Sequence, residues 1–133
     1  MAPITGTSAQ LVDNYITNNK VMIFSKSFCP FCHKVKDLFN ELKVPFEALE
    51  LDLADNGSDL QSALLAKSGQ RTVPNVYISG EHVGGASDTF SAHERGDLMK
   101  LVNKGTHTYD YDLVRERERE ERERERERER ERR

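Results

Sequence analysis

The chain has 133 residues, enough for one domain with a modest hydrophobic core. Its 20 Lys and Arg and 23 Asp and Glu give a formal net charge of −3, and 32% of its residues are charged. No stretch reaches the roughly 18 apolar residues of a membrane span, and residues 1–10 lack the basic and apolar regions of an export signal, so we expect neither a membrane protein nor an exported one.

The charge is concentrated at one end of the chain, where residues 115–133 consist only of Arg and Glu. The preceding part is mildly acidic and has only Arg71 and Arg95 as arginines, so it offers no basic face to a nucleic acid. We predict one domain over residues 1–105 and a C-terminal extension over residues 106–133. The Arg/Glu alternation has nothing to bury and places like charges at i, i+4, which predicts a disordered, mobile segment or a frayed helix. A translated simple repeat and a polyampholyte interaction tail are the two explanations for it.

Three elements are predicted at the start of the domain. Ser8 is a suitable N-cap for a helix that runs to about residue 19 with its apolar residues on one stripe. Residues 21–24 form an apolar run too short for a helix, which indicates a buried strand. A second helix begins at the cysteine pair and ends near residues 44–45, because apolar residues recur at helical spacing after Pro30.

The middle of the domain predicts a second strand and a short helix. Residues 46–51 alternate between apolar and polar side chains, as in a half-buried strand. Asn56, Gly57 and Ser58 then open a helix that Gly69 closes as a C-cap.

A hairpin and a last helix complete the domain. Residues 76–78 and 81–83 flank a Ser-Gly pair at 79–80, a two-residue link typical of antiparallel strands. Capping oxygens at residues 87–88 begin one continuous helix that ends at Gly105. Because a strand–helix–strand unit is parallel and a hairpin is antiparallel, the sequence predicts an α/β fold with a mixed sheet and helices on both faces.

The two cysteines, Cys29 and Cys32, carry the chemistry that the sequence indicates. Cys32 lies three residues before Val35 on the apolar stripe and faces the core, whereas Cys29 lies at the exposed first turn of the helix. Unpaired backbone N–H groups, the helix dipole and Lys26 are expected to stabilise a thiolate at Cys29. Such a thiolate also leaves readily, which favours rapid thiol–disulfide exchange.

A CxxC pair has other uses in proteins. A zinc site needs more ligands, but no second CxxC is present and the four histidines lack finger-like spacing. Cys29, Cys32 and His33 match the haem-attachment pattern, although the motif opens a helix directly after a strand. Two inert core thiols explain Cys32 but not Cys29-Pro30 at a helix start. We expect no metal site and no permanently bound cofactor.

Three segments together resemble the signatures of dithiol glutaredoxins. They are Lys26–Cys32 (KSFCPFC), Arg71–Pro74 (RTVP) and Gly84–Asp88 (GGASD). The resemblance covers roughly residues 8–105 and implies a thioredoxin fold with strand order 2-1-3-4. It also implies a glutathione-dependent thiol–disulfide oxidoreductase that reduces protein–glutathione mixed disulfides and protein disulfides.

The resemblance assigns both sulfurs and a groove for glutathione as co-substrate. It makes Cys29 the nucleophile and Cys32 the resolving thiol. It makes Pro74 a cis-proline, beside which the Val73 N–H and C=O pair with glutathione as an added strand. The other glutathione contacts that it implies are Lys26, Gln70, Arg71, Thr72, Gly85, Ser87 and Asp88.

These contacts divide by the part of glutathione they meet. Lys26 and Arg71, assisted by Gln70, attract the glycine carboxylate. Ser87 and Asp88, at a helix N-terminus, bind the γ-glutamyl group: backbone N–H groups hold its carboxylate and the Asp88 side chain holds its ammonium. The alternatives are that the two cations are solvated surface charges and that Ser87 and Asp88 only cap their helix.

Two positions depart from the commoner family pattern: Phe31 replaces Tyr, which bears on substrate preference, and Ser87 replaces an acidic residue. One rival interpretation is a protein that holds a [2Fe–2S] cluster between two subunits, which Pro30 disfavours because such relatives usually carry a small residue there. A catalytically silent scaffold is another. We expect a cytoplasmic monomer whose partners are glutathione and glutathionylated or disulfide-containing proteins, with no nucleic acid and no membrane.

Overall fold

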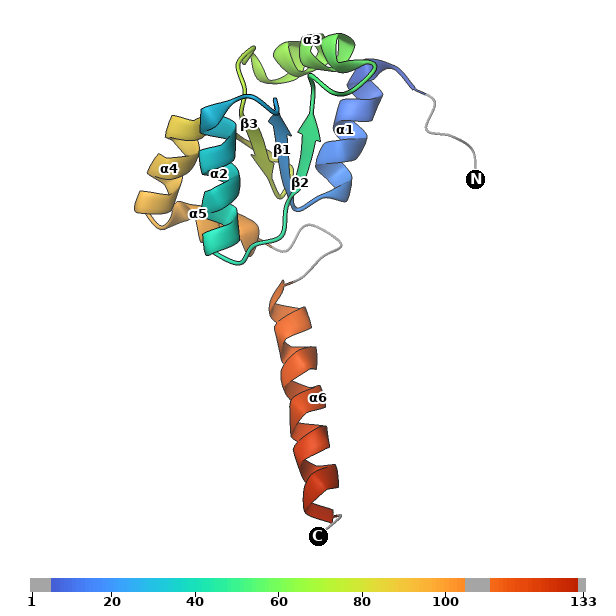
Figure 1. Ribbon diagram of the computed structural model, residues 1–133, viewed down its shortest axis with the longest axis vertical. Helices are drawn as coiled ribbons and strands as arrows, with labels where there is room; N and C mark the ends of the chain where they lie inside the picture. Colours follow the sequence, from blue (N-terminus) through green and yellow to red (C-terminus); the bar gives the residue numbers. More distant parts are fainter. Residues whose placement is uncertain (1–5, 105–110, 132–133) are drawn as a thin grey trace.

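A four-stranded mixed sheet lies between two layers of helices (Figure 1). The structure is a computed structural model that describes residues 6–104 and 111–131, with side chains of the second range from residue 118 onward. Strands β1 (Val21–Ser25), β2 (Glu47–Glu50), β3 (Asn75–Ile78) and β4 (Glu81–Gly84) stand in the order β2-β1-β3-β4. β1 pairs parallel with β2 and antiparallel with β3, and β3 pairs antiparallel with β4. The predicted mixed sheet and its strand order are confirmed.

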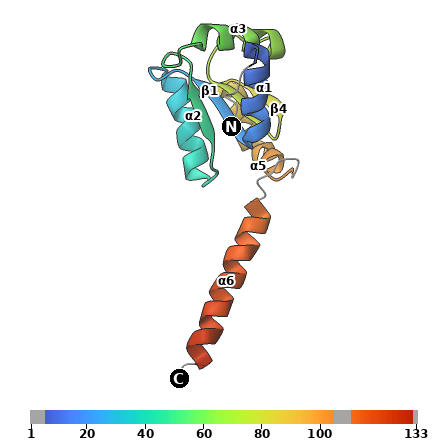
Figure 2. The ribbon, with the colours of Figure 1, turned by 90° about the vertical axis from the view of Figure 1, so that its right-hand side faces the viewer.

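The helices divide between the two faces of the sheet (Figures 1 and 2). Helices α2 (Pro30–Glu41), α4 (Ala86–Glu94) and α5 (Asp97–Val102) cover one face, and helices α1 (Ser8–Asn18) and α3 (Gly57–Ser68) cover the other. Every residue of β1 is buried, because its side chains alternate between the two layers. The apolar run that predicted this strand therefore reflects burial on both of its faces.

Several boundaries differ from the predicted ones. Thr7, not Ser8, is the N-cap of α1, because the Thr7 hydroxyl accepts a hydrogen bond from the Gln10 N–H and the Gln10 side chain accepts one from the Thr7 N–H. α2 ends at Glu41, short of the expected 44–45, where Lys43 takes a left-handed conformation with φ of 57°.

The prediction of one continuous helix from residue 87 to Gly105 is wrong. α4 ends at Glu94 and α5 starts at Asp97, and Gly96 between them has a φ of 78°. A left-handed glycine stops the helical hydrogen bonding and redirects the chain. The break lets α5 follow a different direction from α4 on the same face of the sheet, where Leu98 and Val102 join the core.

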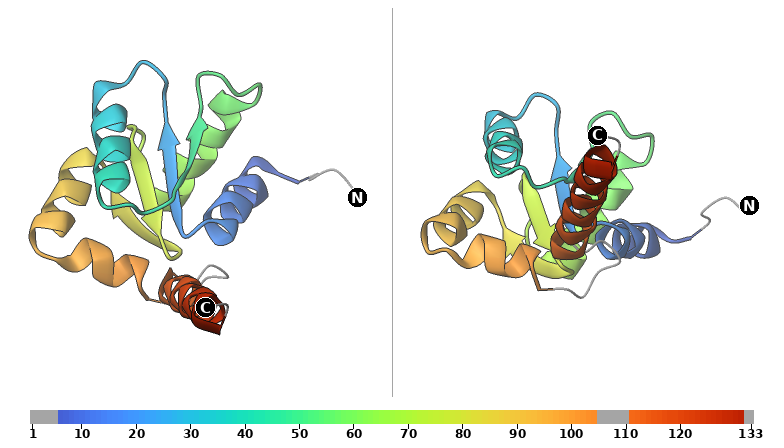
Figure 3. Two further views of the ribbon diagram at one scale, coloured as in Figure 1. Left: turned by 60° about the horizontal axis from the view of Figure 1, so that its bottom comes forward. Right: turned by 90° about the horizontal axis from the view of Figure 1, so that it is seen from below.

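The C-terminal extension contains a further helix, α6 (Tyr111–Glu131), which extends away from the sheet and its helices (Figures 1 and 2) and is foreshortened in the views of Figure 3. Its described side chains, from Glu118 to Glu131, are all exposed. The extension was expected to be a mobile segment or a frayed helix; the helix is described, and its mobility stays a prediction. None of the helices in the described ranges has the length and apolar character to cross a membrane.

Candidate active site

The turn from β1 into α2 places Cys29 at the helix N-terminus. Cys29 is the N-cap of α2, and its Sγ accepts a hydrogen bond from the Cys32 N–H at 3.3 Å. Pro30 occupies the first helical position, where its missing N–H costs no hydrogen bond. The Cys29 sulfur is partly exposed, so a partner can reach it at the helix terminus, where it accepts a hydrogen bond from a backbone N–H.

A second predicted segment reaches the same sulfur. The Val73–Pro74 peptide is cis, as the family resemblance implied, and Pro74 is buried. The Cys29 thiol lies 3.8 Å from the Val73 carbonyl oxygen and donates to it. The backbone of Val73 is therefore placed beside the sulfur at which a disulfide would form.

The second sulfur lies in a different environment. Cys32 is fully buried, and burial together with a hydrogen bond to Cys29 raises the pKa of its thiol to about 11. The charge of Cys29 also contributes to this raised pKa. The contributions of this charge and of the hydrogen bond to Cys29 both disappear once Cys29 is bound in a disulfide. Cys32 is thus a protonated, protected thiol at neutral pH that becomes easier to ionise when a mixed disulfide forms at Cys29.

Asp52 holds the loop before Cys29, although no local sequence pattern indicates this role. The Ser27 N–H donates to Asp52 Oδ1 at 2.9 Å, and the Ser27 hydroxyl donates to Asp52 Oδ2. Both hydrogen bonds lower the pKa of Asp52, and the bond from the Ser27 hydroxyl has the larger effect. The charge of Lys26 lowers the pKa of Asp52 as well. His33 also contacts this loop through Nε2, 2.8 Å from the Ser27 carbonyl oxygen. The parallel pairing of β1 and β2 places their carboxyl ends together, which no local pattern reveals.

Two glutamine side chains support the segment Arg71–Pro74. Gln61 Nε2 donates to the Arg71 carbonyl at 3.0 Å, and Gln70 Nε2 donates to the carbonyls of Thr72 at 3.0 Å and of Pro74 at 2.9 Å. Gln61 was not predicted as a site residue, because its role depends on how α3 packs against this segment. The side chains of Arg71 and Thr72 are exposed, so they are free to meet a ligand, and their glutathione contacts stay predictions.

The third predicted segment joins the site through Gly85. A methyl group in place of a Gly85 hydrogen would lie 3.7 Å from the Pro74 carbonyl oxygen and 3.8 Å from Gln70 Nε2. Asp88 Oδ2 accepts a hydrogen bond from the Gly85 N–H at 3.0 Å, which caps α4. The N-terminus of α4 therefore borders the cis-proline loop, with Ser87 and Asp88 exposed. Their predicted contact with the γ-glutamyl group remains compatible with this cap.

The structure thus brings together Cys29, Val73, Pro74, Gln70 and Gly85 from three segments. Lys26 is partly buried in the loop that precedes Cys29, and its charge lowers the pKa of Asp52. The contact of Lys26 with a glycine carboxylate stays a prediction. In the described part of the chain, no group of three or more His, Cys, Asp and Glu side chains is placed to hold a metal ion.

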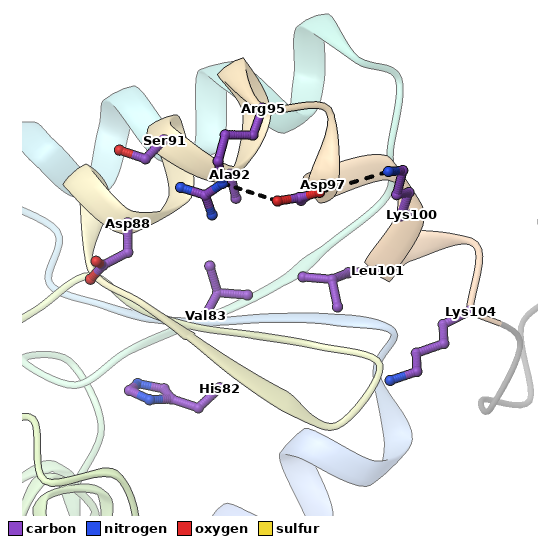
Figure 4. A pocket seen from close by; sticks show the side chains of 10 residues that line it. All are labelled: His82, Val83, Asp88, Ser91, Ala92, Arg95, Asp97, Lys100, Leu101 and Lys104. Atoms are coloured by element: carbon purple, nitrogen blue, oxygen red, sulfur yellow. Dashed lines mark hydrogen bonds and ion pairs between the residues drawn. The ribbon is translucent and has the colours of Figure 1, made fainter.

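A cavity of about 720 Å³ lies elsewhere, between β4 and the pair α4 and α5 (Figure 4). Val83 and Leu101 are apolar residues of its lining, and Asp97, which also lines it, pairs with Arg95 at 3.0 Å and with Lys100 at 3.9 Å. Asp88 is the one predicted site residue that lines it, and neither cysteine does. The thiol chemistry is therefore located at an exposed helix terminus and not in this cavity.

Comparison with known proteins agrees with the geometry. The family model described as Glutaredoxin matches residues 21–83. A glutaredoxin of Vernicia fordii is 48% identical over 89 residues, which are 67% of this chain and 86% of the relative. Glutaredoxin-C6 of Oryza sativa subsp. japonica is also 48% identical, over 67% of this chain and 80% of the relative.

Solved structures give the same result. The buckwheat glutaredoxin–glutathione complex superposes with a TM-score of 0.72 at 36% identity, covering 76% of this chain and 93% of that one. Wheat glutaredoxin superposes with a TM-score of 0.71 at 43% identity, covering 73% of this chain and 92% of that one. The chain therefore belongs to the glutaredoxin family of glutathione-dependent thiol–disulfide oxidoreductases and has the thioredoxin fold.

Proposed function

We propose that the chain reduces protein–glutathione mixed disulfides, with the Cys29 thiolate as the nucleophile. The observation that carries this proposal is the contrast between the two sulfurs: Cys29 is accessible and accepts a helix-terminal N–H, while Cys32 is fully buried. The Cys29 thiolate attacks the glutathione sulfur, forming one S–S bond as the bond to the protein sulfur breaks and that sulfur takes up a proton. A second glutathione thiolate then releases oxidised glutathione and regenerates the Cys29 thiolate.

Glutathione is proposed to lie along the cis-proline loop. The Val73 backbone beside Cys29 offers the N–H and C=O that an extended tripeptide pairs with, and a relative has been solved as a glutaredoxin–glutathione complex. Lys26 and Arg71 supply positive charge for the glycine carboxylate. The N-terminus of α4, with Ser87 and Asp88, receives the γ-glutamyl group.

Protein disulfides are proposed as a second substrate class, and they need Cys32. After Cys29 attacks such a disulfide, the Cys32 thiolate attacks Cys29, forming the Cys29–Cys32 disulfide and releasing the partner thiol. The loss of the Cys29 charge and hydrogen bond lowers the pKa of Cys32 from about 11 at this stage. The resolving sulfur is therefore activated by the intermediate that it resolves.

Protein partners are supported by the surface around Cys29. Phe28 is 72% exposed, Phe31 is 59% exposed and Leu53 is 71% exposed. The hydrogen bonds between Ser27 and Asp52 join the loop that carries Leu53 to the loop that carries Phe28. Exposed apolar side chains grouped beside a reactive atom are typical of contact surfaces for proteins.

Replacement of each cysteine by serine tests the mechanism. Cys29→Ser is expected to abolish turnover of a glutathionylated peptide, because it removes the attacking sulfur. Cys32→Ser is expected to keep deglutathionylation within about threefold of wild type and to lose reduction of a protein disulfide, because the resolving thiol is gone. Steady-state assays on both substrates measure this, and an equal loss of both activities in the two variants contradicts the division of roles.

We also propose the cytoplasm as the site of action, with the chain working as a monomer. A dithiol that must be returned to its reduced form by glutathione requires a reducing compartment. Fractionation of cells that express the tagged chain tests the location: recovery in an organelle, as the name of the chloroplastic rice Glutaredoxin-C4 indicates for that relative, contradicts it. Sedimentation of the purified chain tests the oligomeric state.

A further inference from the structure

The side chain of Gln70 connects the two residues that flank Val73, Thr72 and Pro74, with the beginning of α4. Its amide nitrogen donates to the Thr72 carbonyl at 3.0 Å and to the Pro74 carbonyl at 2.9 Å. Both amide hydrogens are therefore used, and none is left for a carboxylate of a ligand. The same nitrogen lies beside Gly85, where an added methyl group would approach it to 3.8 Å.

The backbone of Gln70 is itself held by a chain of partly buried hydrogen bonds. The Gln70 N–H donates to the Ser68 hydroxyl oxygen at 3.1 Å, and Asn75 Nδ2 donates to the same oxygen at 3.2 Å. Asn75 is 1% exposed, and its Oδ1 lies 3.0 Å from His82 Nε2 on β4. Gln70 thus links the loop beside Cys29 to α3, β3 and β4 through hydrogen bonds.

The residue that this arrangement fixes is Val73. Its carbonyl accepts from the Cys29 thiol, and it lies between the two carbonyls that Gln70 holds. A peptide unit anchored on both sides keeps its N–H and C=O at a fixed angle, which an added strand needs. Without these two hydrogen bonds, the buried Pro74 carbonyl loses its side-chain donor and the loop relaxes.

We propose that Gln70 is a positioning residue that holds the Val73 backbone in the orientation that pairs with the cysteinyl part of glutathione. This inference rests on the proposed function and changes the role of Gln70 from an aid to glycine carboxylate binding to a clamp on the loop. Gln70→Leu keeps the approximate size of the side chain and removes both donors. The KM of this variant for a glutathione mixed disulfide is expected to rise about fivefold to tenfold, with kcat within about twofold of wild type.

Two substrates separate positioning from direct carboxylate binding. One is a peptide in mixed disulfide with glutathione, and the other is the same peptide in mixed disulfide with γ-glutamylcysteine, which lacks the glycine. Gln70→Leu is expected to raise KM for both substrates, because Val73 pairs with the part that they share. The matched control Arg71→Met is expected to raise KM only for the glutathione substrate. A KM penalty of Gln70→Leu confined to the glutathione substrate overturns the positioning role.

A second variant covers the case in which Gln70→Leu folds poorly. Gln70→Glu places a carboxylate, which accepts hydrogen bonds but cannot donate them, against two carbonyl oxygens at neutral pH. Its KM is expected to fall as the pH is lowered from 7 to 5, because protonation restores one donor, while the KM of Gln70→Leu follows that of wild type. A KM profile of Gln70→Glu that parallels wild type overturns the proposal.

A control variant and the wild type itself separate the positioning role from general destabilisation and from failure of the proposed function. Gln10→Leu removes a capping side chain in the first turn of α1, outside the site. This variant is expected to have a lower thermal stability and an unchanged KM. If it changes KM as much as Gln70→Leu does, general destabilisation explains the effect and the positioning role fails. If wild type turns over neither substrate, the proposed function itself fails, and the positioning role fails with it.

Discussion

Cys32 lies in the core behind the partly exposed Cys29, and this burial has a consequence for stability. Because the pKa of its thiol is about 11 in the folded chain and about 8.5–9 in an unfolded one, the folded state retains the proton over this range while the unfolded state releases it. The contribution of Cys32 to stability is thus fully present below pH 9 and is lost as the pH rises through 11.

The expected loss is about 2–3 kcal/mol in the free energy of unfolding between pH 9 and pH 11, from about 1.4 kcal/mol for each unit of pKa difference. Urea unfolding of the reduced protein across this range measures it, and Cys32→Ala serves as the reference, because it keeps every other titrating group. A wild type that follows Cys32→Ala over the whole range contradicts the assigned ionisation.

The sequence predicted where the two cysteines lie, but it did not predict the residues that hold the loops around them. The helical stripe through Val35 placed Cys32 inside and Cys29 at the helix start, and both placements agree with the structure. Asp52 and Gln61 were missed, because each acts on a residue brought near it by the sheet or by α3. Local spacing contains no information about such contacts.

Among the elements, the start of α3 depends on a close approach of two backbones. A methyl group on Gly57 would lie 1.8 Å from the Leu51 carbonyl oxygen and 2.9 Å from the carbonyl carbon, so backbone atoms would have to move. The Leu51 N–H is in turn bonded to the Ser25 carbonyl at the end of β1, at 2.8 Å, which leaves little freedom. The sequence identified Gly57 only as part of a helix-opening cluster.

We expect Gly57→Ala to lower the free energy of unfolding by about 2 kcal/mol or more, because the clash is with backbone and not with a flexible side chain. The neighbouring Ser58→Ala is the control, since Ser58 is exposed at the next position of the same helix, and its effect is expected to stay within about 0.5 kcal/mol. Urea denaturation of the three proteins measures the difference, and equal stabilities contradict the assigned contact.

One interruption of the Arg/Glu alternation within α6 places some opposite charges four residues apart. Strict alternation places like charges four residues apart, which led to the expectation of a mobile segment or a frayed helix. The doublet Glu120-Glu121 shifts the phase of the repeat, so that pairs spanning it are opposite in charge. Arg124 accordingly forms an ion pair with Glu120, with 3.7 Å between nitrogen and oxygen.

For the molecule as a whole, none of the described α6 side chains takes part in either hydrophobic cluster. In the described part of the chain, both clusters draw their residues from the segment between Leu11 and Val102, and the α6 side chains from Glu118 to Glu131 are exposed. Truncation after Leu113 is therefore expected to leave the Tm within about 2 °C and kcat/KM within about twofold of the full chain. Calorimetry and the deglutathionylation assay measure this, and far-UV circular dichroism reports the removal of helix. A fall of more than about 5 °C contradicts the independence of the domain.

What the sequence determined by itself is the order of the elements and the identity of the reactive pair, because periodicity, caps and turn residues act between neighbours along the chain. The hairpin at residues 79–80 and the cap at Gly69 are further examples. The tertiary structure alone decided the support of the Arg71 carbonyl by Gln61 and the anchoring of Ser27 by Asp52. Each depends on how the sheet or α3 places two segments side by side, and such contacts join residues whose separation in the sequence gives no indication of their distance in space.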